Sequence, residues 1–137
     1  EIGVRLVGSE MCIRDRIDYL EFIGWKEITE REEMLTAQLL AGMKKIPGVH
    51  ILGSGDEKEH CGIVSFTVDD VHPHDIASIL DEAHVAVRAG HHCAQPLLEW
   101  LGISSCARAS VAFYNTPEDV GRFLDQLAQV RRMMGYE

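Results

Sequence analysis

Residues 62–68 read Gly-Ile-Val-Ser-Phe-Thr-Val, and the rest of the fold can be placed around this stretch. Apolar side chains alternate there with small or polar ones, which predicts a β-strand with one buried face. Pro73 suits the first turn of a helix that follows the strand. Residues 85–88 predict the next strand, so one helix connects two strands. The apolar face of that helix comprises Ile76, Ile79, Leu80 and Ala83.

Three elements are predicted on the N-terminal side of this unit. Residues 17–23 predict a short helix that ends near Gly24. A second helix is expected to begin at Thr29, because Glu32 follows it at the spacing of a capping box. Residues 49–52 then predict a short strand. The buried stripe of the second helix comprises Leu35, Leu39, Gly42, Met43 and Ile46.

On the C-terminal side, a turn or two of helix is predicted at 96–101, followed by a strand at 107–113. Thr116 is expected to cap the last helix, because Pro117 follows at the first helical position and acids occupy the first turn. These elements predict an α+β fold, with helices packed on one face of a small, mostly antiparallel sheet. The buried stripe of the last helix comprises Val120, Phe123, Leu124, Leu127 and Val130.

Length and composition limit the class of protein. The chain has 137 residues, enough for a single domain, and 46% of them are hydrophobic. Thirteen basic residues against 22 acidic ones give a formal net charge of −9, which argues against a nucleic-acid surface. No apolar run approaches the roughly 18 residues of a membrane-spanning helix, and no signal peptide is recognised. We therefore expect neither a membrane nor a nucleic acid as partner.

Residues 1–16 are distinct from the rest of the chain. They lack a clean periodicity and join the amphipathic pattern abruptly at Ile17. The string from Val7 to Asp15 looks like translated sequencing adaptor, so we interpret residues 1–16 as an unmatched leader of artefactual origin. The alternative is a disordered or strand-forming leader. The domain itself is expected to span residues 17–137.

The segment 88–96 (RAGHHCAQP) carries the residues that are best suited to chemistry. Gly90 and a final proline bracket it with turn residues, which predicts an exposed loop. Cys93 follows His91 and His92, and nearby cationic or hydrogen-bonding groups raise the fraction of reactive thiolate. We therefore expect a reactive cysteine rather than a buried one. The two histidines are expected to tune the thiol, to move protons or to pack.

Arg108 lies in the run Cys-Ala-Arg-Ala-Ser at residues 106–110. Its small neighbours leave room for the guanidinium group to hold a carboxylate through two parallel hydrogen bonds. Arg88 precedes the cysteine in a similar setting. The alternative for either arginine is a structural salt bridge with one of the acids.

The chain contains four cysteines, and none of them forms a C-x-x-C pair. Their spacing resembles no disulfide framework, which favours a reducing, cytoplasmic setting. Cys61 and Cys106 are expected in or near the core, and Cys12 is given no function.

The remaining tryptophans and histidines allow simpler interpretations. Trp25 and Trp100 are expected to pack, while His72 and His74 lie around a helix start, where we expect capping or solvent-facing roles. A structural zinc ion is an alternative for the cysteine loop. No metal is predicted, however, because the spacing matches no common zinc pattern and adjacent ligands cannot readily share one tetrahedral ion. The zinc-type side chains considered are His60, Cys61, His91, His92, Cys93 and Cys106.

From residue 17 onwards, the chain resembles the C-terminal part of the SufS-type cysteine desulfurases, class V members of the fold-type I pyridoxal-phosphate enzymes. The motif at residues 88–96 is highly specific for that group. The run Arg-Ala-Ser at 108–110, followed by Phe-Tyr-Asn-Thr at 113–116, is a second and independent match. The resemblance implies the small C-terminal domain of such an enzyme.

The resemblance also implies an activity. Enzymes of this group use pyridoxal 5'-phosphate to remove sulfur from L-cysteine, giving L-alanine and an enzyme persulfide for iron–sulfur cluster assembly. By this resemblance Cys93 is the persulfide-forming nucleophile, Arg108 binds the substrate carboxylate and Arg88 is an active-site arginine. His91 and His92 line the site. A homodimer and a sulfur-acceptor protein of the Suf type are the implied partners.

The chain departs from the family pattern in four respects. No lysine matches the one that holds the cofactor, and the phosphate-binding loop and the histidine that stacks on the cofactor have no counterpart. We therefore expect a fragment that is inactive on its own. His84 stands where the family often has glycine, so a left-handed backbone there would be costly. The alternatives are a selenocysteine lyase of the same family and a stand-alone sulfur-carrier or metal-binding module. The lysines of the chain are Lys26, Lys44, Lys45 and Lys58.

Overall fold

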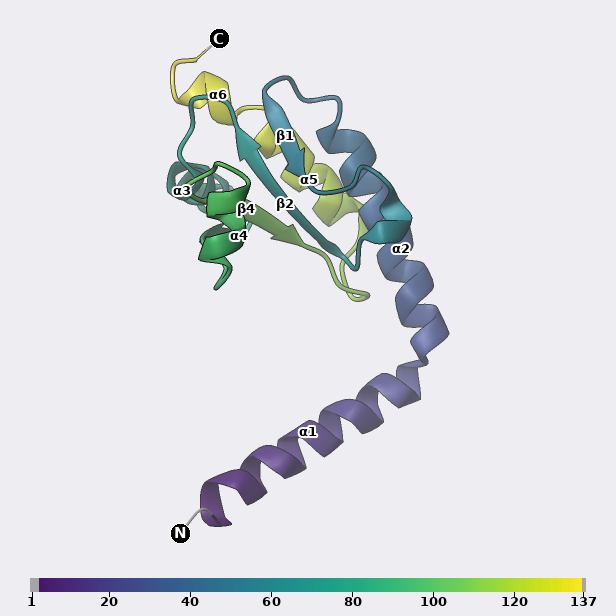
Figure 1. Ribbon diagram of the computed structural model, residues 1–137. Coiled ribbons are helices and arrows are strands. Elements are labelled where there is room, and N and C mark those ends of the chain that lie inside the picture. Colours follow the sequence, from purple (N-terminus) through teal and green to yellow (C-terminus); the bar gives the residue numbers. More distant parts are fainter. Residues whose placement is uncertain (1–2, 137) are drawn as a thin grey trace.

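The computed structural model describes residues 3–136, with side chains from Cys12 onward. Its helices and strands form a small layered domain from which the first helix projects (Figure 1). The elements are α1 (Gly3–Ile23), α2 (Trp25–Met43), β1 (Val49–Leu52), the 3-10 helix η1 (Glu57–Glu59), β2 (Ile63–Val68), α3 (Pro73–Glu82), β3 (Arg88–Gly90), α4 (Gln95–Trp100), β4 (Cys106–Ser110), α5 (Pro117–Leu127) and α6 (Val130–Met133).

The four strands form one sheet in the order β1-β2-β4-β3, and every neighbouring pair is antiparallel. The register pairs Val49 with Val68 between β1 and β2, and Ile63 with Ser110 between β2 and β4. The predicted α+β class with a small antiparallel sheet is therefore confirmed. Because β4 lies between β2 and β3, the strand that precedes the cysteine loop forms an edge of the sheet.

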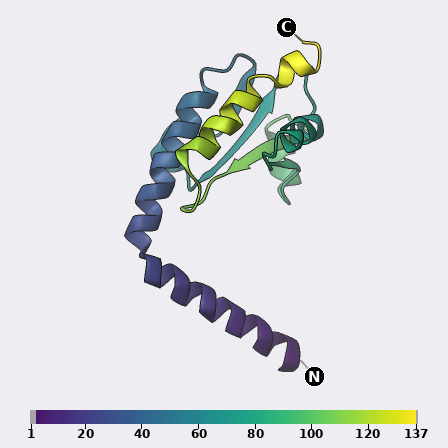
Figure 2. The ribbon, with the colours of Figure 1, turned by 180° about the vertical axis from the view of Figure 1, so that it is seen from behind.

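The core lies between one face of the sheet and the helices. On β2, Val64, Phe66 and Val68 are buried while the residues between them are more exposed, as the alternation predicts. Figure 2 shows α5 crossing that face with α2 beside it. Phe66 meets Phe123 of α5 edge to face, with ring centroids 6.0 Å apart. The buried helix residues of this core include Leu35, Leu39, Leu40, Met43, Ile76, Leu80, Val120 and Leu127.

Helix α1 runs without interruption through residue 16, where the sequence predicts a boundary, and it ends at Ile23 as expected. Gly24, with φ 99°, separates it from α2. Trp25 is 57% exposed, so the expectation that it packs is wrong, because the junction of α1 and α2 lies outside the core. None of the described helices is both long and apolar enough to span a bilayer.

The predicted start of the second helix is also wrong. Helix α2 begins at Trp25, four residues before Thr29. The Thr29 hydroxyl donates a hydrogen bond of 2.9 Å to the carbonyl oxygen of Trp25. A threonine that bonds back to the preceding turn lies inside a helix, so the capping-box spacing at Thr29 does not mark a helix start.

Three predicted boundaries move. The strand expected at 85–88 is β3, Arg88–Gly90, and the strand expected at 107–113 is the shorter β4. Pairing with β4 sets the limits of β3, and pairing with β2 carries β4 on to Ser110. Asn115 Oδ1 then accepts a 2.9 Å hydrogen bond from the amide of Ala112 and closes the next turn. The last helix divides into α5 and α6, although Val130 stays buried.

Two helix starts are confirmed at the level of single hydrogen bonds. The ring of His72 accepts a 3.3 Å bond from the amide of His74 at the start of α3, with Pro73 in the first turn. At the start of α5, Thr116 Oγ1 accepts from the amide of Asp119, and Asp119 Oδ2 accepts from the amide of Thr116. This reciprocal pair is a capping box.

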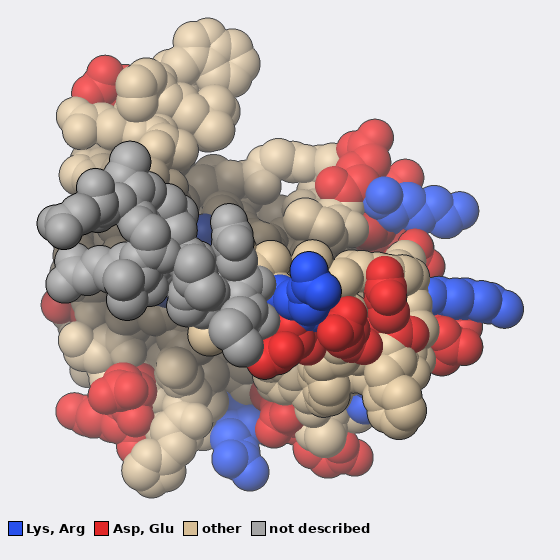
Figure 3. Space-filling view, turned by 90° about the horizontal axis from the view of Figure 1, so that it is seen from below, with Lys and Arg blue, Asp and Glu red and all other residues tan. Residues whose placement is uncertain are grey.

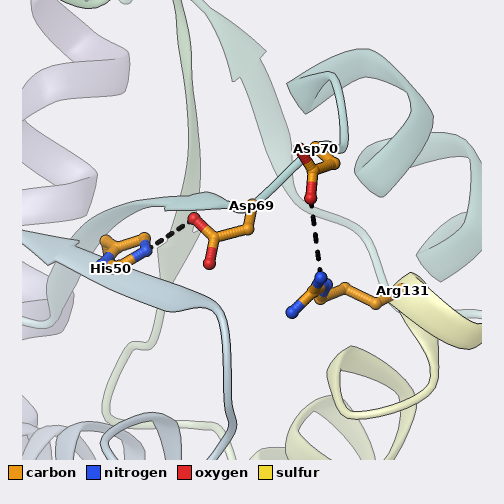
Figure 4. Close-up of polar contacts among 4 residues, drawn as sticks. All are labelled: His50, Asp69, Asp70 and Arg131. Carbon is orange, nitrogen blue, oxygen red and sulfur yellow. Dashed lines mark hydrogen bonds and ion pairs between the residues drawn. The ribbon is translucent and has the colours of Figure 1, made fainter. Parts of the chain in front are cut away.

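Two ion pairs join the residues that follow β2 to the start of β1 and to the start of α6. Figure 4 shows His50 Nε2 beside Asp69 Oδ1 at 2.7 Å, and Arg131 beside Asp70 at 3.5 Å. In Figure 3, acidic side chains with basic ones among them gather on the right of the view and along its lower part, in line with the net charge of −9. Exposed pairs of this kind add little stability.

Candidate functional site

The candidate site is built on the sheet face opposite the helices. Arg88 of β3 is directly opposite Arg108 of β4, and Arg108 is also opposite Ser65 of β2. Residues opposite each other in an antiparallel pair project to the same face, with Cβ atoms about 5 Å apart. The strands therefore place two guanidinium groups and a hydroxyl in one row. Ala107 and Ala109, which flank Arg108, point the other way and are buried in the core.

The two arginines form no ion pair with any acid in residues 12–136. Arg108 is half-buried, and its Nε is buried without a hydrogen-bond partner among the described residues. A buried donor without a partner is costly, and like charges directly opposite each other repel. An anion placed between the two groups would relieve both costs, so this row has the electrostatics of a carboxylate-binding site.

The cysteine loop connects β3 to α4 through residues 91–94. Gly90 ends β3 with φ 127°, a value that side chains disfavour. His92 (φ 54°) and Cys93 (φ 59°) are then both left-handed, at about 1–2 kcal/mol for each residue. The Cys93 side chain is exposed, which confirms the expected exposed loop. Two consecutive left-handed residues that are not glycine are local strain at the predicted nucleophile.

His92 attaches this loop to the sheet. Its Nε2 lies 3.0 Å from the carbonyl oxygen of Cys106 on β4, two residues from Arg108. Within the loop, the Ala94 amide donates a 2.9 Å bond to the carbonyl oxygen of His91, whose side chain is exposed. The structure thus brings the loop close to the arginine row. No hydrogen bond between described residues joins Cys93 to either arginine.

The other cysteines differ from Cys93. Cys106 is buried, as expected, and burial raises the pKa of its thiol, although a hydrogen bond with Ser65 and the charge of Arg108 act against this. Cys61 is exposed, so the expectation that it lies in or near the core is wrong: it sits in the turn before β2. Trp100 on α4 is 81% exposed, so the expectation that it packs is wrong as well.

Two contributors to the site were not predicted from the sequence. Ser65 shares the row with Arg108, and the carbonyl group of Cys106 holds His92. The alternation along residues 62–68 places Ser65 on the polar face of its strand. It does not reveal that β4, more than 40 residues away, is the neighbour, because strand pairing is not a local property.

A cavity of about 290 Å³ lies on the helix side of the sheet and is separate from this row. The residues that line it include His84, Ala109, Ser110, Val111, Asp119 and Arg122. His84 is left-handed, with φ 60°, at the position where the sequence suggested this costly conformation. In residues 12–136, no group of three or more histidine, cysteine, aspartate or glutamate side chains could hold a metal ion.

Comparison with known proteins identifies the family of the chain. The model of the class-V aminotransferase family matches residues 3–123. A probable cysteine desulfurase of Staphylococcus aureus is 43% identical over 137 residues, which is 100% of this chain and 33% of the relative. The chain thus spans about a third of the length of the curated relatives it matches.

Solved structures give the same result. The apo cysteine desulfurase of Thermococcus onnurineus superposes with a TM-score of 0.81 and 39% identity, covering 85% of this chain and 29% of that one. The cysteine desulfurase CsdA of Escherichia coli, in an S-sulfonic acid form, has a TM-score of 0.68 and 29% identity, covering 77% of this chain and 25% of that one. Because the family model, the curated relatives and the solved structures agree, the chain belongs to the class-V aminotransferase family.

Proposed function

We propose that this chain is the small domain of a cysteine desulfurase, in which Cys93 takes sulfur from L-cysteine. The observation that carries the proposal is the row of Arg88 and Arg108, two guanidinium groups without an acidic partner among the described residues, beside a loop that exposes a cysteine. The row fits the carboxylate of a small amino acid, and the loop supplies a thiol. The names of the similar proteins support the same reaction.

In this reaction, the Cys93 thiolate attacks the sulfur of the substrate. The S–S bond forms with the electron pair of the thiolate, and the pair of the broken C–S bond stays with the substrate carbon. A proton then adds to that carbon, so L-alanine leaves and a persulfide remains on Cys93. Arg108 holds the substrate carboxylate by its two parallel N–H groups, and Arg88 adds a second charge. His91 and His92 line the site.

The cofactor proposed for the complete enzyme, pyridoxal 5'-phosphate, does not fit the residues of this chain alone. Lys44 donates a 2.6 Å bond to the carbonyl oxygen of Gly55, and Lys26 lies 3.7 Å from Glu30 on α2. Lys45 and Lys58 also lie outside β3, β4 and the cysteine loop. None of these amines is available at the arginine row, so a lysine from outside this chain would have to hold the cofactor.

A sulfur-acceptor protein of the Suf type, a homodimer and a cytoplasmic setting complete the proposal. The exposed side chain of Cys93 supports transfer of a persulfide to a second protein. The four cysteines are free thiols, which supports a reducing compartment.

Substitution of Cys93 in the complete enzyme tests the proposal, with Cys61 as matched control because both thiols are exposed and lie in turns. Cys93→Ala is expected to abolish persulfide formation and alanine release while the cofactor absorbance band stays. Cys61→Ala is expected to keep wild-type rates. Alanine release that survives in Cys93→Ala, or falls equally in both variants, overturns the assignment. Parallel assays with L-selenocysteine decide between a desulfurase and a selenocysteine lyase.

Arg108→Lys tests the carboxylate site. Lysine keeps the charge but cannot form two parallel hydrogen bonds to a carboxylate. We expect KM for L-cysteine to rise about tenfold or more, the change expected when one charge-assisted hydrogen bond is lost. An unchanged KM would show that Arg108 does not bind the substrate.

A further inference from the structure

We propose that His92 is a positioning residue whose ring fixes the cysteine loop to strand β4, rather than a base that works through Nε2. The contribution of this contact to sulfur transfer rests on the proposed function. The anchoring itself is a property of the loop and the sheet in this chain, and it can be tested separately.

The hydrogen bond between His92 and Cys106 determines which ring nitrogen carries the proton. Nε2 of His92 lies 3.0 Å from the carbonyl oxygen of Cys106. A carbonyl oxygen only accepts hydrogen bonds, so Nε2 is the protonated nitrogen and donates. In the neutral ring, Nδ1 then holds the lone pair. Nε2 is therefore committed to the sheet and cannot accept a proton from a thiol.

The acceptor is also constrained. Cys106 is 1% exposed and is paired with Gly90 at the last register position between β3 and β4. Buried carbonyl groups need hydrogen-bond partners, because water cannot reach them. The His92 ring meets this need at the point where the ladder between the two strands ends. The donor and the acceptor thus each stabilise the other's position.

The loop needs such an anchor. His92 and Cys93 are both left-handed, which is an unfavourable conformation for residues with side chains, and only residues 91–94 separate β3 from α4. Such strain persists only where surrounding contacts hold the backbone. The bond from His92 acts one residue before Cys93, whereas His91 has an exposed side chain without a hydrogen bond to the described residues. His91 is therefore the matched control.

The unmodified 137-residue chain provides the first test. Long-range proton–nitrogen correlation spectra of the ¹⁵N-labelled chain distinguish the two ring tautomers of a histidine. We expect a single Nε2–H tautomer for His92 at neutral pH, with a ring proton that exchanges slowly with water. The Nδ1–H tautomer, or a rapid average of the two, overturns the proposal without any substitution.

Substitutions provide the second test, through hydrogen exchange of the Ala94 amide, which closes the loop on His91. His92→Phe keeps an aromatic ring but removes the hydrogen-bond donor. Exchange of the Ala94 amide is expected to become about tenfold faster, which is the change in an opening equilibrium that the loss of one hydrogen bond produces. His92→Gln restores a donor and is expected to return exchange to within about threefold of wild type. His91→Phe is expected to leave it unchanged. Equal exchange in all three variants, or no rescue by glutamine, refutes the anchor.

A last measurement separates positioning from proton transfer. Glutamine can donate a hydrogen bond to the carbonyl oxygen of Cys106 but cannot act as a base, so activity that recovers in His92→Gln comes from positioning, and activity that glutamine does not restore overturns the positioning role. In the complete enzyme, His92→Phe is expected to lower kcat more than it changes KM, with recovery in His92→Gln. If Cys93→Ala retains desulfurase activity, the proposed function fails. The tautomer and the exchange rates still show, independently of activity, whether His92 holds the loop on β4.

Discussion

Gly62 and Gly121 are predicted to respond in opposite ways to the same substitution, glycine to alanine. Gly62 lies directly before β2 with φ 75°, and a Cβ atom added there would lie 2.5 Å from the carbonyl oxygen of Val111. Its own carbonyl oxygen accepts a 2.7 Å bond from the Val111 amide. Gly121 lies inside α5, and an added Cβ atom would meet nothing within 4 Å.

The magnitudes follow from these surroundings. At Gly62, alanine adds about 1–2 kcal/mol for the left-handed backbone and about 1–3 kcal/mol for the contact with a backbone oxygen that cannot easily move. Reduced entropy of the unfolded chain offsets about 0.4–1 kcal/mol of this cost. We expect Gly62→Ala to lower the free energy of unfolding by about 3 kcal/mol. Gly121→Ala is expected to raise it by about 0.5–1 kcal/mol, the helix preference of alanine over glycine.

Urea unfolding followed by circular dichroism measures both changes. With a slope of about 2 kcal/mol per molar urea, the midpoints of the two variants are expected to differ by more than about 1 M. The unfolding slope should stay the same in both variants, because neither changes the surface that unfolding exposes. The reasoning is refuted if Gly62→Ala unfolds at the wild-type midpoint, or if the two variants shift in the same direction.

Three further outcomes are expected. Thr116→Ala removes the cap of α5 and should lower the free energy of unfolding by about 1 kcal/mol. Thr29→Ala, inside α2, should change this free energy by less than about 0.5 kcal/mol. Equal losses of the two variants in urea unfolding contradict the assignment of the cap. The hydrogen bond from the Thr116 amide lowers the pKa of the Asp119 carboxyl group below 3.8. The stability that the ionised Asp119 contributes is therefore present above that pH and is lost as the pH falls through the pKa of the folded state. The difference in urea midpoint between wild type and Asp119→Asn should shrink in acid, and a difference that persists in acid contradicts this contribution. Burial raises the pKa of the Cys106 thiol, so iodoacetamide should modify Cys106 far more slowly than Cys93 in the folded chain. The two modification rates should converge in urea. Similar rates without urea would show that Cys106 is accessible and contradict the prediction.

Local patterns in the sequence were sufficient for several elements. The cap at Thr116, the proline start at Pro73 and the alternation along residues 62–68 each depend on contacts within a few residues, and all are confirmed. The specific motif at 88–96 similarly identified the cysteine loop, and the structure confirms that Cys93 is exposed. In these cases the interacting groups are neighbours along the chain, so their spacing determines the structure.

Other features depend on partners far away in the sequence. A capping-box spacing at Thr29 lies inside a helix that starts earlier, and the limits of β3 are set by pairing with β4 rather than by residues 85–88 themselves. Trp25 and Trp100 are apolar yet exposed, because Trp25 is the first residue of α2 and Trp100 is the last residue of α4, and neither lies on the buried part of its helix. Side-chain type alone does not decide burial, which depends on where each element packs.

The candidate site shows the same division. The sequence by itself determined which residues have suitable chemistry: a cysteine beside two histidines, and arginines among small neighbours. Only the tertiary structure decided that Arg88 is opposite Arg108, that Ser65 completes their row and that His92 donates to the carbonyl group of Cys106. The physical reason is that strand register is fixed by hydrogen bonds between segments distant along the chain, and a shift of one residue would turn each side chain to the other face.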